Sequence, residues 1–475
     1  MNTSFSCRGY SLVKQELSNS ETNDLKKILT VKPFVHKNYA GNNNPFPVYA
    51  ESKKKIYLPR FFGIDKYGEP LNYKLGTPLE VNLNFGKSLR PIQEPIVEAY
   101  LNNVNDTTGG GGIIAIPCGY GKTVIGLYIA CKLKLKTLIV VHKEFLLNQW
   151  KERINEFVPD IRVGRLQGSV IKVNNCEIVI GMLQSISMKD YEEDVFKDFG
   201  LVIFDECHHL GAEVFSKALL KTNFKYTLGL SATPRRDDGL TKVFEWYLGK
   251  IVYQIKKRNK EDVSVKIIKY FNEDEEYCKE EKNFKGLNNS SKMINNICSF
   301  IPRTEVIVNE LGELHKENRK ILVLSNRVSH LKDIHILLTK INIDKVGYYI
   351  GGMKEKELDE STKNDIILAT FSMAEEGFDC KELDSVIFAS PRSKIEQAVG
   401  RILRKKVEDR VVTPKVIDIA DEFSMFINQN TKRFKFYKKN KYEIVFENHT
   451  PFPDNDEYEE KQKTNKLPTD LEFLD

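Results

Sequence analysis

The stretch GGGGIIAIPCGYGKTVIG, residues 109–126, predicts a buried strand, a glycine-rich turn and an apolar helix in direct succession. Glycines let the backbone turn tightly so that successive N–H groups point inward, and a helix that begins near Thr123 adds its positive dipole end. Such a turn favours phosphate: Lys122 would reach the β- and γ-phosphates of a nucleotide, and the Thr123 hydroxyl would ligate Mg²⁺. The strict phosphate-loop pattern has Gly where this chain has Ile116, so a plain glycine-rich turn with a surface lysine is the alternative.

Short apolar strands alternate with amphipathic segments on either side of this turn. Five such strands, from IIAIP to YTLGLSATP, fall between residues 89 and 252, and five more, from RKILVLSN to PKVIDIAD, fall between 301 and 430. Alternation at this spacing predicts parallel, doubly wound sheets. The sequence therefore predicts an α/β protein with two parallel-sheet domains in tandem, residues 89–252 and 301–430, of which only the first has a phosphate loop.

The remaining segments differ in composition from the two sheet domains. Residues 1–88 are predicted as an N-terminal accessory region of undecided role, residues 253–300 as a charged linker or insertion, and residues 431–475 as a basic and then mixed-charge tail. The basic part of the tail, TKRFKFYKKNK, suits two structures. It would either track a nucleic-acid backbone with base stacking, or form a helix over the second domain with Phe434 and Phe436 or Tyr437 facing inward.

Composition excludes several classes of protein. The longest apolar runs are far shorter than the roughly 18 residues of a membrane span, and the N-terminus lacks a secretory signal, so we expect an intracellular protein with no membrane partner. The eight cysteines form no CxxC pair, which argues against a zinc site or a disulfide framework. With 72 basic against 66 acidic residues, the net charge of +6 permits a polyanionic partner without requiring one.

A pair of acids supports the phosphate-loop interpretation. The apolar run LVIF, residues 201–204, leads into Asp205 and Glu206, which places both at the carboxyl end of a strand, where ligands bind in open α/β sheets. Asp205 would hold Mg²⁺, and Glu206 would orient and deprotonate an attacking water. Because adjacent carboxylates raise each other's pKa, a bound cation would relieve their repulsion.

Four motifs then identify a family. The segments Gly119–Thr123, Asp205–His208, Ser231–Thr233 and Gln397–Arg404 occur in the order of motifs I, II, III and VI of the superfamily 2 helicases, and the chain resembles that family over residues 89–430. The sequences DECHH, GLSATPRRDDG and EEGFDC…QAVGRILR are most similar to the DExH group that contains the XPB repair and transcription helicase. That group also includes phage relatives and the helicases of large cytoplasmic DNA viruses, such as the poxvirus-type transcript-release helicase.

The resemblance implies two RecA-like domains that sandwich ATP and walk along a strand by closing and opening. It implies catalytic roles for Lys122, Asp205, Glu206, Arg401 and Arg404, with Mg²⁺ held by Thr123 and Asp205. It implies that ATP is bound by Gln93, Pro117, Cys118, Gly119, Tyr120, Gly121, Lys122, Thr123, Gly377, Asp379 and Gln397. His208, Ser231 and Thr233 would couple hydrolysis to movement. The nucleic-acid backbone would be held by His142, Lys143, Ser325, Arg327 and Thr370.

Several of these single-residue matches leave alternatives open. Gln93 would otherwise be an exposed helix residue, Asp379 a turn cap, and the backbone-contact residues ordinary loop or capping residues. The chain also departs from its relatives at two places. Met182 stands where they often have a phosphate-binding Thr, and the segment Arg236–Asp238 has Asp in place of the Glu of the XPB-like Arg-Glu-Asp element.

The sequence therefore predicts an ATP-dependent helicase or translocase that moves 3′ to 5′ on single-stranded or duplex DNA, as XPB-like relatives do. RNA is the alternative track, and the transcription machinery is a candidate partner. The protein would act in viral-type transcription, repair or replication, in the host cytoplasm or virion if the chain is viral. The rivals are a duplex translocase or RNA helicase without DNA strand separation, and a non-catalytic nucleic-acid scaffold. Lys122, Glu206 and Arg404 together argue against the scaffold, which has no chemical need for them.

Overall fold

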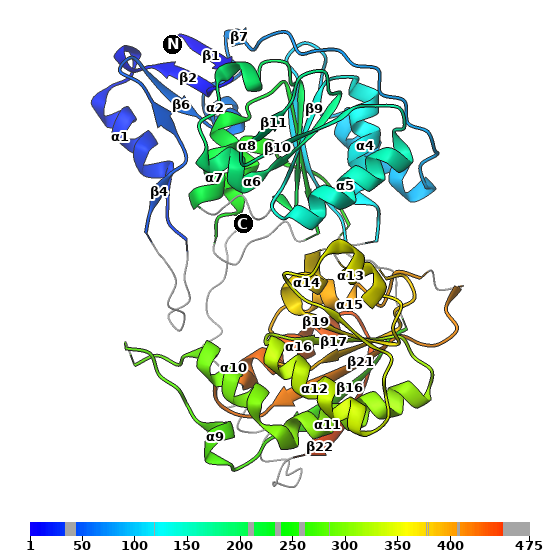
Figure 1. Ribbon diagram of the computed structural model, residues 1–475. Helices are drawn as coiled ribbons and strands as arrows, with labels where there is room; N and C mark the ends of the chain where they lie inside the picture. Colours follow the sequence, from blue (N-terminus) through cyan, green and yellow to red (C-terminus); the bar gives the residue numbers. More distant parts are fainter. Residues whose placement is uncertain are drawn as a thin grey trace. The chain divides into compact units, whose positions relative to one another are not determined.

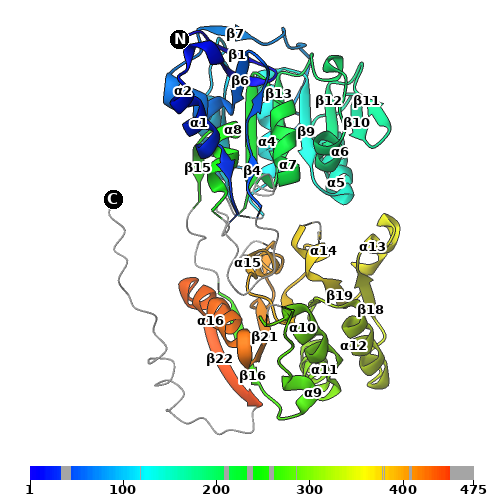
Figure 2. The same cartoon turned by 90° about the vertical axis from the view of Figure 1, so that its left-hand side faces the viewer.

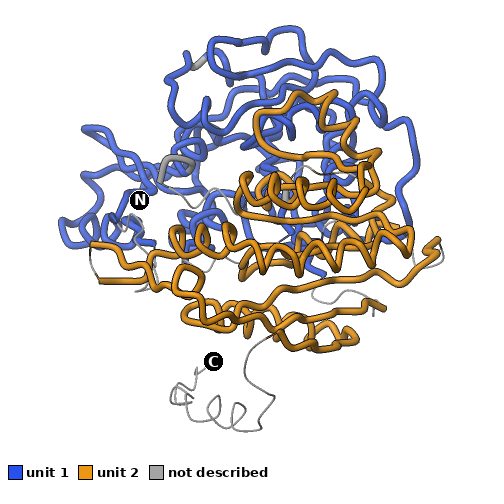
Figure 3. Tube along the Cα trace, turned by 60° about the horizontal axis from the view of Figure 1, so that its bottom comes forward, with its two compact units in different colours: residues 1–258 blue, residues 259–475 orange. Residues whose placement is uncertain are grey.

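The computed structural model describes residues 1–33, 44–117, 119–207, 213–232, 239–255, 262–284, 286–376, 378, 380–405 and 409–449. The chain divides into two compact units, residues 1–258 and 259–475, drawn in blue and orange in Figure 3. Each unit has its own sheet and its own hydrophobic cores. Within the described residues, we find no helix with both the length and the apolar character that a membrane span needs.

The first unit is centred on an eight-stranded sheet in the order β11-β10-β12-β9-β13-β14-β8-β15, which is parallel except for the β10–β11 pair. Its strands are β8 (Gly110–Ala115), β9 (Thr137–Val141), β10 (Val163–Gln167), β11 (Val170–Lys172), β12 (Ile178–Met182), β13 (Leu201–Asp205), β14 (Tyr226–Ser231) and β15 (Ile251–Gln254). Along β9, Leu138 and Val140 belong to one core and Ile139 and Val141 to the other, because successive side chains of a strand point to opposite faces.

Helices cover both faces of this sheet, as Figure 1 shows. One face packs against α3 (Glu94–Leu101), α4 (Lys122–Leu133) and α5 (Glu144–Phe157). The other packs against α6 (Leu183–Met188), α7 (Glu213–Lys221) and α8 (Thr241–Leu248). The unit is therefore doubly wound, and its phosphate loop joins the end of β8 to the start of α4.

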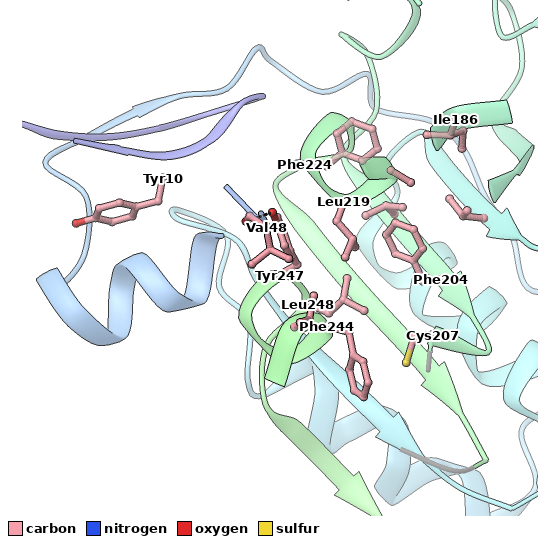
Figure 4. Packing of buried hydrophobic residues seen from close by; sticks show 14 of the residues in the cluster. Tyr10, Val48, Ile186, Phe204, Cys207, Leu219, Phe224, Phe244, Tyr247 and Leu248 are labelled. Atoms are coloured by element: carbon pink, nitrogen blue, oxygen red, sulfur yellow. Dashed lines mark hydrogen bonds between the residues drawn. The ribbon is translucent and has the colours of Figure 1, made fainter. Parts of the chain in front are cut away.

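Residues 1–88 add a smaller sheet, in the order β5-β6-β2-β1-β7, on the α7 and α8 side. Its elements are β1 (Thr3–Ser6), β2 (Gly9–Val13), α1 (Asn19–Ile28), β5 (Ala50–Glu51), β6 (Lys55–Leu58), α2 (Arg60–Tyr67) and β7 (Asn72–Lys74), and the short pair β3 (Thr30–Val31) and β4 (Phe46–Pro47) lies beside them. Tyr10 belongs to the same hydrophobic core as Phe204 and Leu248 (Figure 4). The Tyr247 hydroxyl donates to the Val48 carbonyl at 2.6 Å, so the two sheets share one core.

A buried arginine fixes this N-terminal region to the larger sheet. Arg60, 2% exposed, donates to the carbonyls of Thr108 at 2.7 Å and Lys225 at 2.9 Å, close to where β8 and β14 begin. Its guanidinium carbon lies 4.6 Å from the centroid of the Phe5 ring. Burial lowers the pKa of Arg60. Because a buried charge is costly unless its donors find partners, these carbonyls bind the two sheets into one unit.

The second unit has a seven-stranded, fully parallel sheet in the order β18-β19-β17-β20-β21-β16-β22. Its strands are β16 (Ser264–Tyr270), β17 (Ile321–Ser325), β18 (Val346–Tyr349), β19 (Ile366–Thr370), β20 (Ser385–Phe388), β21 (Lys415–Asp421) and β22 (Glu443–His449). One face packs against α9 (Glu275–Cys278), α10 (Ser290–Ser299), α11 (Ile301–Lys316) and α12 (Val328–Lys340). The other packs against α13 (Glu355–Ser361), α14 (Phe371–Glu376), α15 (Glu396–Val399) and α16 (Ser424–Lys439), as Figure 2 shows.

The predicted α/β fold with two parallel-sheet domains in tandem is confirmed. Two further segments add to the second sheet. β16 and α10 come from residues 253–300, and β16 pairs in parallel with both β21 and β22. α16 runs through most of the basic segment 431–441, with Tyr437 buried and Phe434 and Phe436 partly buried against the same core. Of the two structures that this segment suits, the chain adopts the helix.

Candidate active site

The phosphate loop has the backbone that its glycines predict. Gly119 and Gly121 have φ values of +90° and +82°, in the left-handed region that favours glycine, and Gly121 is the N-cap of α4. A Cβ on Gly121 would also lie 2.3 Å from Nε2 of Gln93, whereas one on Gly119 would meet no atom within 4 Å. The loop is therefore packed on the Gln93 side and open at Gly119.

Gln93 and Arg90 brace this loop. The Gln93 side chain is buried; its Nε2 donates to the Tyr120 carbonyl at 2.9 Å and its Oε1 accepts from the Arg90 N–H at 2.9 Å. The Arg90 guanidinium donates to the Gly119 carbonyl at 3.1 Å. Gln93 is thus not the exposed helix residue that was its alternative, and its contact with a nucleotide base stays a prediction.

Three strand ends meet beside the loop. In the parallel register, Asp205 of β13 lies opposite Leu230 of β14, and Ser231 lies opposite Ala115 of β8. Ser231 is fully buried, and its carbonyl accepts from the Ile116 N–H at 3.0 Å. The carboxyl ends of β8, β13 and β14 therefore form one edge, on which the two predicted motifs converge.

Across this edge, the Lys122 ammonium forms an ion pair with the Glu206 carboxylate, and the two side chains are 11% and 14% exposed. Glu206 has a φ of +47°. A residue other than glycine in the left-handed region costs about 1–3 kcal/mol, and it persists where the surrounding structure enforces it, often at functional sites. The ion pair and the bent backbone both aim Glu206 back at the loop.

The Asp205 carboxylate is held from two sides. Its Oδ1 accepts from the Glu206 N–H at 3.0 Å, and its Oδ2 accepts from the indole Nε1–H of Trp150 at 2.8 Å. Burial, and then the neighbouring Glu206 carboxylate, raise the pKa of Asp205, while Lys122 and the Trp150 hydrogen bond oppose that rise. A cation beside Asp205 would favour its charged form.

These residues fit a nucleotide phosphate with Mg²⁺. The first N–H groups of the 12-residue helix α4 favour an anion, and Lys122 at its first position adds a positive charge. The Thr123 hydroxyl and the Asp205 carboxylate are the oxygen ligands that Mg²⁺ prefers. Among the described residues, no group of three or more His, Cys, Asp or Glu side chains could hold a metal ion. A site with a single carboxylate suits Mg²⁺, which commonly completes its shell with substrate phosphates and water.

The motif VI residues lie in the second unit. Arg401 is 5% exposed and donates to the Phe378 carbonyl at 3.0 Å. Arg404 and Gln397 are half-buried. Three side chains bind carbonyls in the segment that leads from β20 towards α15: Arg303 donates to Ala389 at 2.6 Å, Asn326 to Pro391 at 2.9 Å and Arg433 to Arg392 at 2.7 Å. The chain that leads into motif VI is therefore held on both faces of the sheet.

The five predicted backbone-contact residues differ in their surroundings. His142 and Ser325 are buried, and the Ser325 Oγ lies 3.0 Å from Nδ1 of His330. The Arg327 guanidinium donates to the carbonyl and to the hydroxyl of Ser291, each at 2.9 Å. Lys143 precedes α5, Thr370 ends β19, and both are half-buried. Binding of nucleic acid by these residues stays a prediction.

Five predicted site residues lie outside the described residues: Cys118, His208, Thr233, Gly377 and Asp379. The segment Arg236–Asp238 lies outside them as well. The structure in turn adds Trp150 and Arg90, which the motifs did not single out. Trp150 is one of only two tryptophans in the chain, and a buried indole N–H usually needs an acceptor, which was the one signal that could have found it.

Two family models match the chain. "Type III restriction enzyme, res subunit" matches residues 86–236, and "Helicase conserved C-terminal domain" matches residues 303–406. These two ranges contain the phosphate loop with its acids and the motif VI arginines, respectively.

Among curated relatives, a "Putative ATP-dependent RNA helicase" of Acanthamoeba polyphaga mimivirus is 38% identical over 92% of this chain and 85% of its own. A relative of the same description from African swine fever virus is 28% identical over 69% of this chain and 67% of its own. The "DNA 3'-5' translocase XPB2" of Sulfurisphaera tokodaii is 35% identical over 40% of this chain and 43% of its own. The crystal structure of T4 UvsW, at 19% identity, covers 91% of this chain and 96% of its own with a TM-score of 0.34, too low to add to these findings.

Proposed function

The chain belongs to the superfamily 2 helicases, related to the helicases of large DNA viruses, and on that premise we propose that it moves along DNA by hydrolysing ATP at the β8–β13–β14 edge. As a member it is a nucleic-acid-dependent ATPase with ATP as its substrate. The observation that carries the proposed site is the convergence of the phosphate loop, the Lys122–Glu206 pair and Asp205 at one sheet edge.

We propose the following division of the chemistry. Lys122 and the loop N–H groups would bind the phosphates, and Thr123 and Asp205 would hold Mg²⁺, which would stabilise charge on the phosphoryl oxygens. Glu206 would accept a proton from the attacking water. Its carboxylate is paired with the Lys122 ammonium, so phosphate binding to Lys122 would release Glu206 to act as the base. The site would then become competent only when a nucleotide is bound.

Arg401 and Arg404 would complete the machinery from the second unit. Guanidinium groups supplied by a second element stabilise charge on the transferred phosphoryl group and make hydrolysis depend on a conformational change. Gln397, His208, Ser231 and Thr233 would transmit that change. Hydrolysis would in this way be coupled to movement of one unit against the other.

ATP hydrolysis with and without single-stranded DNA tests the site. We expect strong stimulation by DNA in the wild type and its loss in Glu206→Gln, with ATP binding retained. Glu177→Gln is the matched control, because Glu177 stands directly before β12, at the amino ends of the strands and so away from the carboxyl ends where Glu206 lies, and it pairs there with Arg162. Hydrolysis by Glu206→Gln at the wild-type rate would contradict the assignment of the base.

The track and direction are tested by strand displacement. The 3′-to-5′ movement on DNA is supported by the name of the Sulfurisphaera relative, whereas the names of the mimivirus and African swine fever virus relatives favour RNA as the second candidate. We expect displacement from DNA duplexes with a 3′ tail and none from those with a 5′ tail. Displacement of RNA duplexes alone would favour the RNA helicase, and stimulation by duplex without displacement would favour a translocase. A DNA track suits transcription, repair or replication, with the transcription machinery as the proposed partner.

A further inference from the structure

The positive charge of the chain is concentrated in its N-terminal region. Residues 1–88 hold 13 of the 72 basic residues and only 7 of the 66 acidic ones, an excess of six that equals the net charge of the whole chain. Residues 89–475 hold 59 of each. The two helicase family models cover residues 86–236 and 303–406, so the excess lies almost wholly outside them.

Six of these lysines gather at one end of the small sheet. Lys26 and Lys27 occupy the last turn of α1, Lys53 and Lys54 form the turn between β5 and β6, and Lys14 and Lys55 flank that turn; we call these six the hairpin lysines. Lys14 and Lys26 both pair with Glu51, at 2.6 and 2.9 Å, which brings α1 and the hairpin together. The Lys14 N–H also donates to the Lys54 carbonyl at 2.9 Å.

This surface keeps a large excess of charge after its internal pairing. Among the described residues, Glu51 is the acid paired with the hairpin lysines, and its partners are Lys14 and Lys26. Lys27, Lys53 and Lys54 are exposed, and Lys55 is half-buried. Exposed lysines clustered on one surface attract polyanions, above all the phosphate backbone of nucleic acid.

The surroundings favour a duplex over a single strand. Single-stranded nucleic acid is bound on exposed aromatic side chains on which its bases stack. In the described part of residues 1–88, every aromatic residue is buried or half-buried, and no fully exposed ring stands beside the lysines. In a duplex the bases are already stacked, and the phosphates alone present a dense line of negative charge.

We propose that the hairpin lysines bind the phosphate backbone of duplex nucleic acid without reading its sequence. This inference rests on the proposed function only in taking nucleic acid as the partner. The shared core and Arg60 join the lysines firmly to the first unit. A duplex held there would move together with the unit that carries the phosphate loop.

The test is the salt dependence of duplex binding by the full chain without nucleotide. The variant K27Q/K53Q/K54Q removes three exposed charges. The control R8Q/K66Q/K74Q removes three exposed charges from the same region, and Lys74 belongs to β7, at the opposite sheet edge from β5. With a blunt duplex of about 20 base pairs, we expect the hairpin variant to bind roughly tenfold more weakly or worse, and its slope of log K against log[salt] to be shallower by about 2 to 3. The control should keep most of the wild-type affinity and most of the wild-type salt dependence.

The outcomes separate this inference from the proposed function. If the wild type binds duplex and the two triple variants have equal slopes, the hairpin lysines are not the binding surface, and the ATPase assignment stays intact. Equal losses on duplex and single strand would overturn the duplex assignment. A wild type that binds no nucleic acid, and whose ATP hydrolysis nucleic acid does not stimulate, would overturn the proposed function itself. Unchanged thermal midpoints and unstimulated ATP hydrolysis in both variants establish that the losses concern binding.

Discussion

The two parallel sheets use charge in opposite ways. In the first unit, the Lys122–Glu206 pair stands at the carboxyl edge of the strands, with both side chains partly exposed. In the second unit, the Arg303–Asp421 and Arg433–Asp418 pairs lie inside the fold, with side chains 0% and 2% exposed. Asp418 and Asp421 are three residues apart on β21, so they face opposite sides of that sheet, one towards α16 and one towards α11.

This difference in burial decides whether another charged group can replace one partner of an ion pair. A partly exposed ion pair can open when a phosphate competes for its lysine. A fully buried pair is fixed, because removing either partner leaves an uncompensated charge in the interior. Each buried aspartate also accepts a tyrosine hydroxyl, from Tyr277 and Tyr437 at 2.8 Å each, and burial with the neighbouring carboxylate raises the pKa of both tyrosines so that they remain donors. The same fold thus carries the proposed ATP site in one unit and fixed, buried ion pairs in the other.

The largest effect is expected from breaking the buried Arg303–Asp421 pair. Asp421→Asn removes the charge that compensates Arg303 and should lower the free energy of unfolding of the second unit by about 3–5 kcal/mol. Urea unfolding of the full chain measures the change in this free energy, from the transition in which the second unit unfolds. Asp365→Asn is the control, because the Lys345–Asp365 pair at 3.7 Å is exposed and should contribute at most about 1 kcal/mol. Equal losses in the two variants would remove the distinction between buried and surface pairs.

The next effect concerns the exchangeable pair. Lys122→Ala should lower ATP hydrolysis by about 10²–10³-fold, the usual loss when a charge-stabilising donor is removed from a reaction site. Its thermal midpoint should fall by less than that of Asp421→Asn, because the Lys122 and Glu206 side chains are still 11% and 14% exposed, whereas the Arg303–Asp421 pair is fully buried. Parallel assays of hydrolysis and unfolding measure both quantities. A loss of stability as large as that of Asp421→Asn would mean that the Lys122–Glu206 pair is also a fixed pair on which the fold depends.

The Lys122–Glu206 pair could be predicted from the sequence, whereas the two buried arginine–aspartate pairs could not. Lys122 and Glu206 each lie in a short segment with its own local signal: a glycine turn before a helix, and an acid pair after an apolar run. Arg303 and Asp421 are 118 residues apart, and each lies in an ordinary amphipathic or apolar segment. β16 was equally hidden within a charge-dense segment, because its pairing with β21 and β22 joins distant parts of the chain. Local chemistry can be recognised in a sequence, whereas pairing across a fold requires the fold.

A smaller effect is expected from Trp150, whose indole N–H donates to the Asp205 carboxylate in the proposed ATP site. Trp150→Phe removes the hydrogen bond to Asp205, and hydrogen bonds to charged groups contribute about 1.5–3 kcal/mol. We expect ATP hydrolysis to fall roughly tenfold or more by that conversion. Because the bond favours the Asp205 carboxylate, its loss raises the pKa of Asp205 further and should move the acid limb of the pH–rate profile to higher pH. Trp246→Phe is the matched control, at the other tryptophan of the chain. A lower rate with an unshifted acid limb would mean that Trp150 acts through packing alone.

The smallest effect extends the comparison to pH. His330, beside Ser325 in the second unit, is fully buried, and burial with the positive charge of Arg303 lowers its pKa from 6.5 to about 3. The folded state therefore binds no proton there between about pH 6.5 and 3, whereas the unfolded state does, so stability must fall as pH drops below 6.5. The full slope is about 1.4 kcal/mol per pH unit. Between about pH 6 and 5, before most carboxylates titrate, His330→Asn should flatten the pH dependence by close to that amount. His315→Asn, at a half-buried histidine in the last turn of α11, is the control. If the wild type and His330→Asn keep parallel slopes there, the interior of the second unit admits a proton beside Arg303, and its charges are less fixed than the buried pairs require.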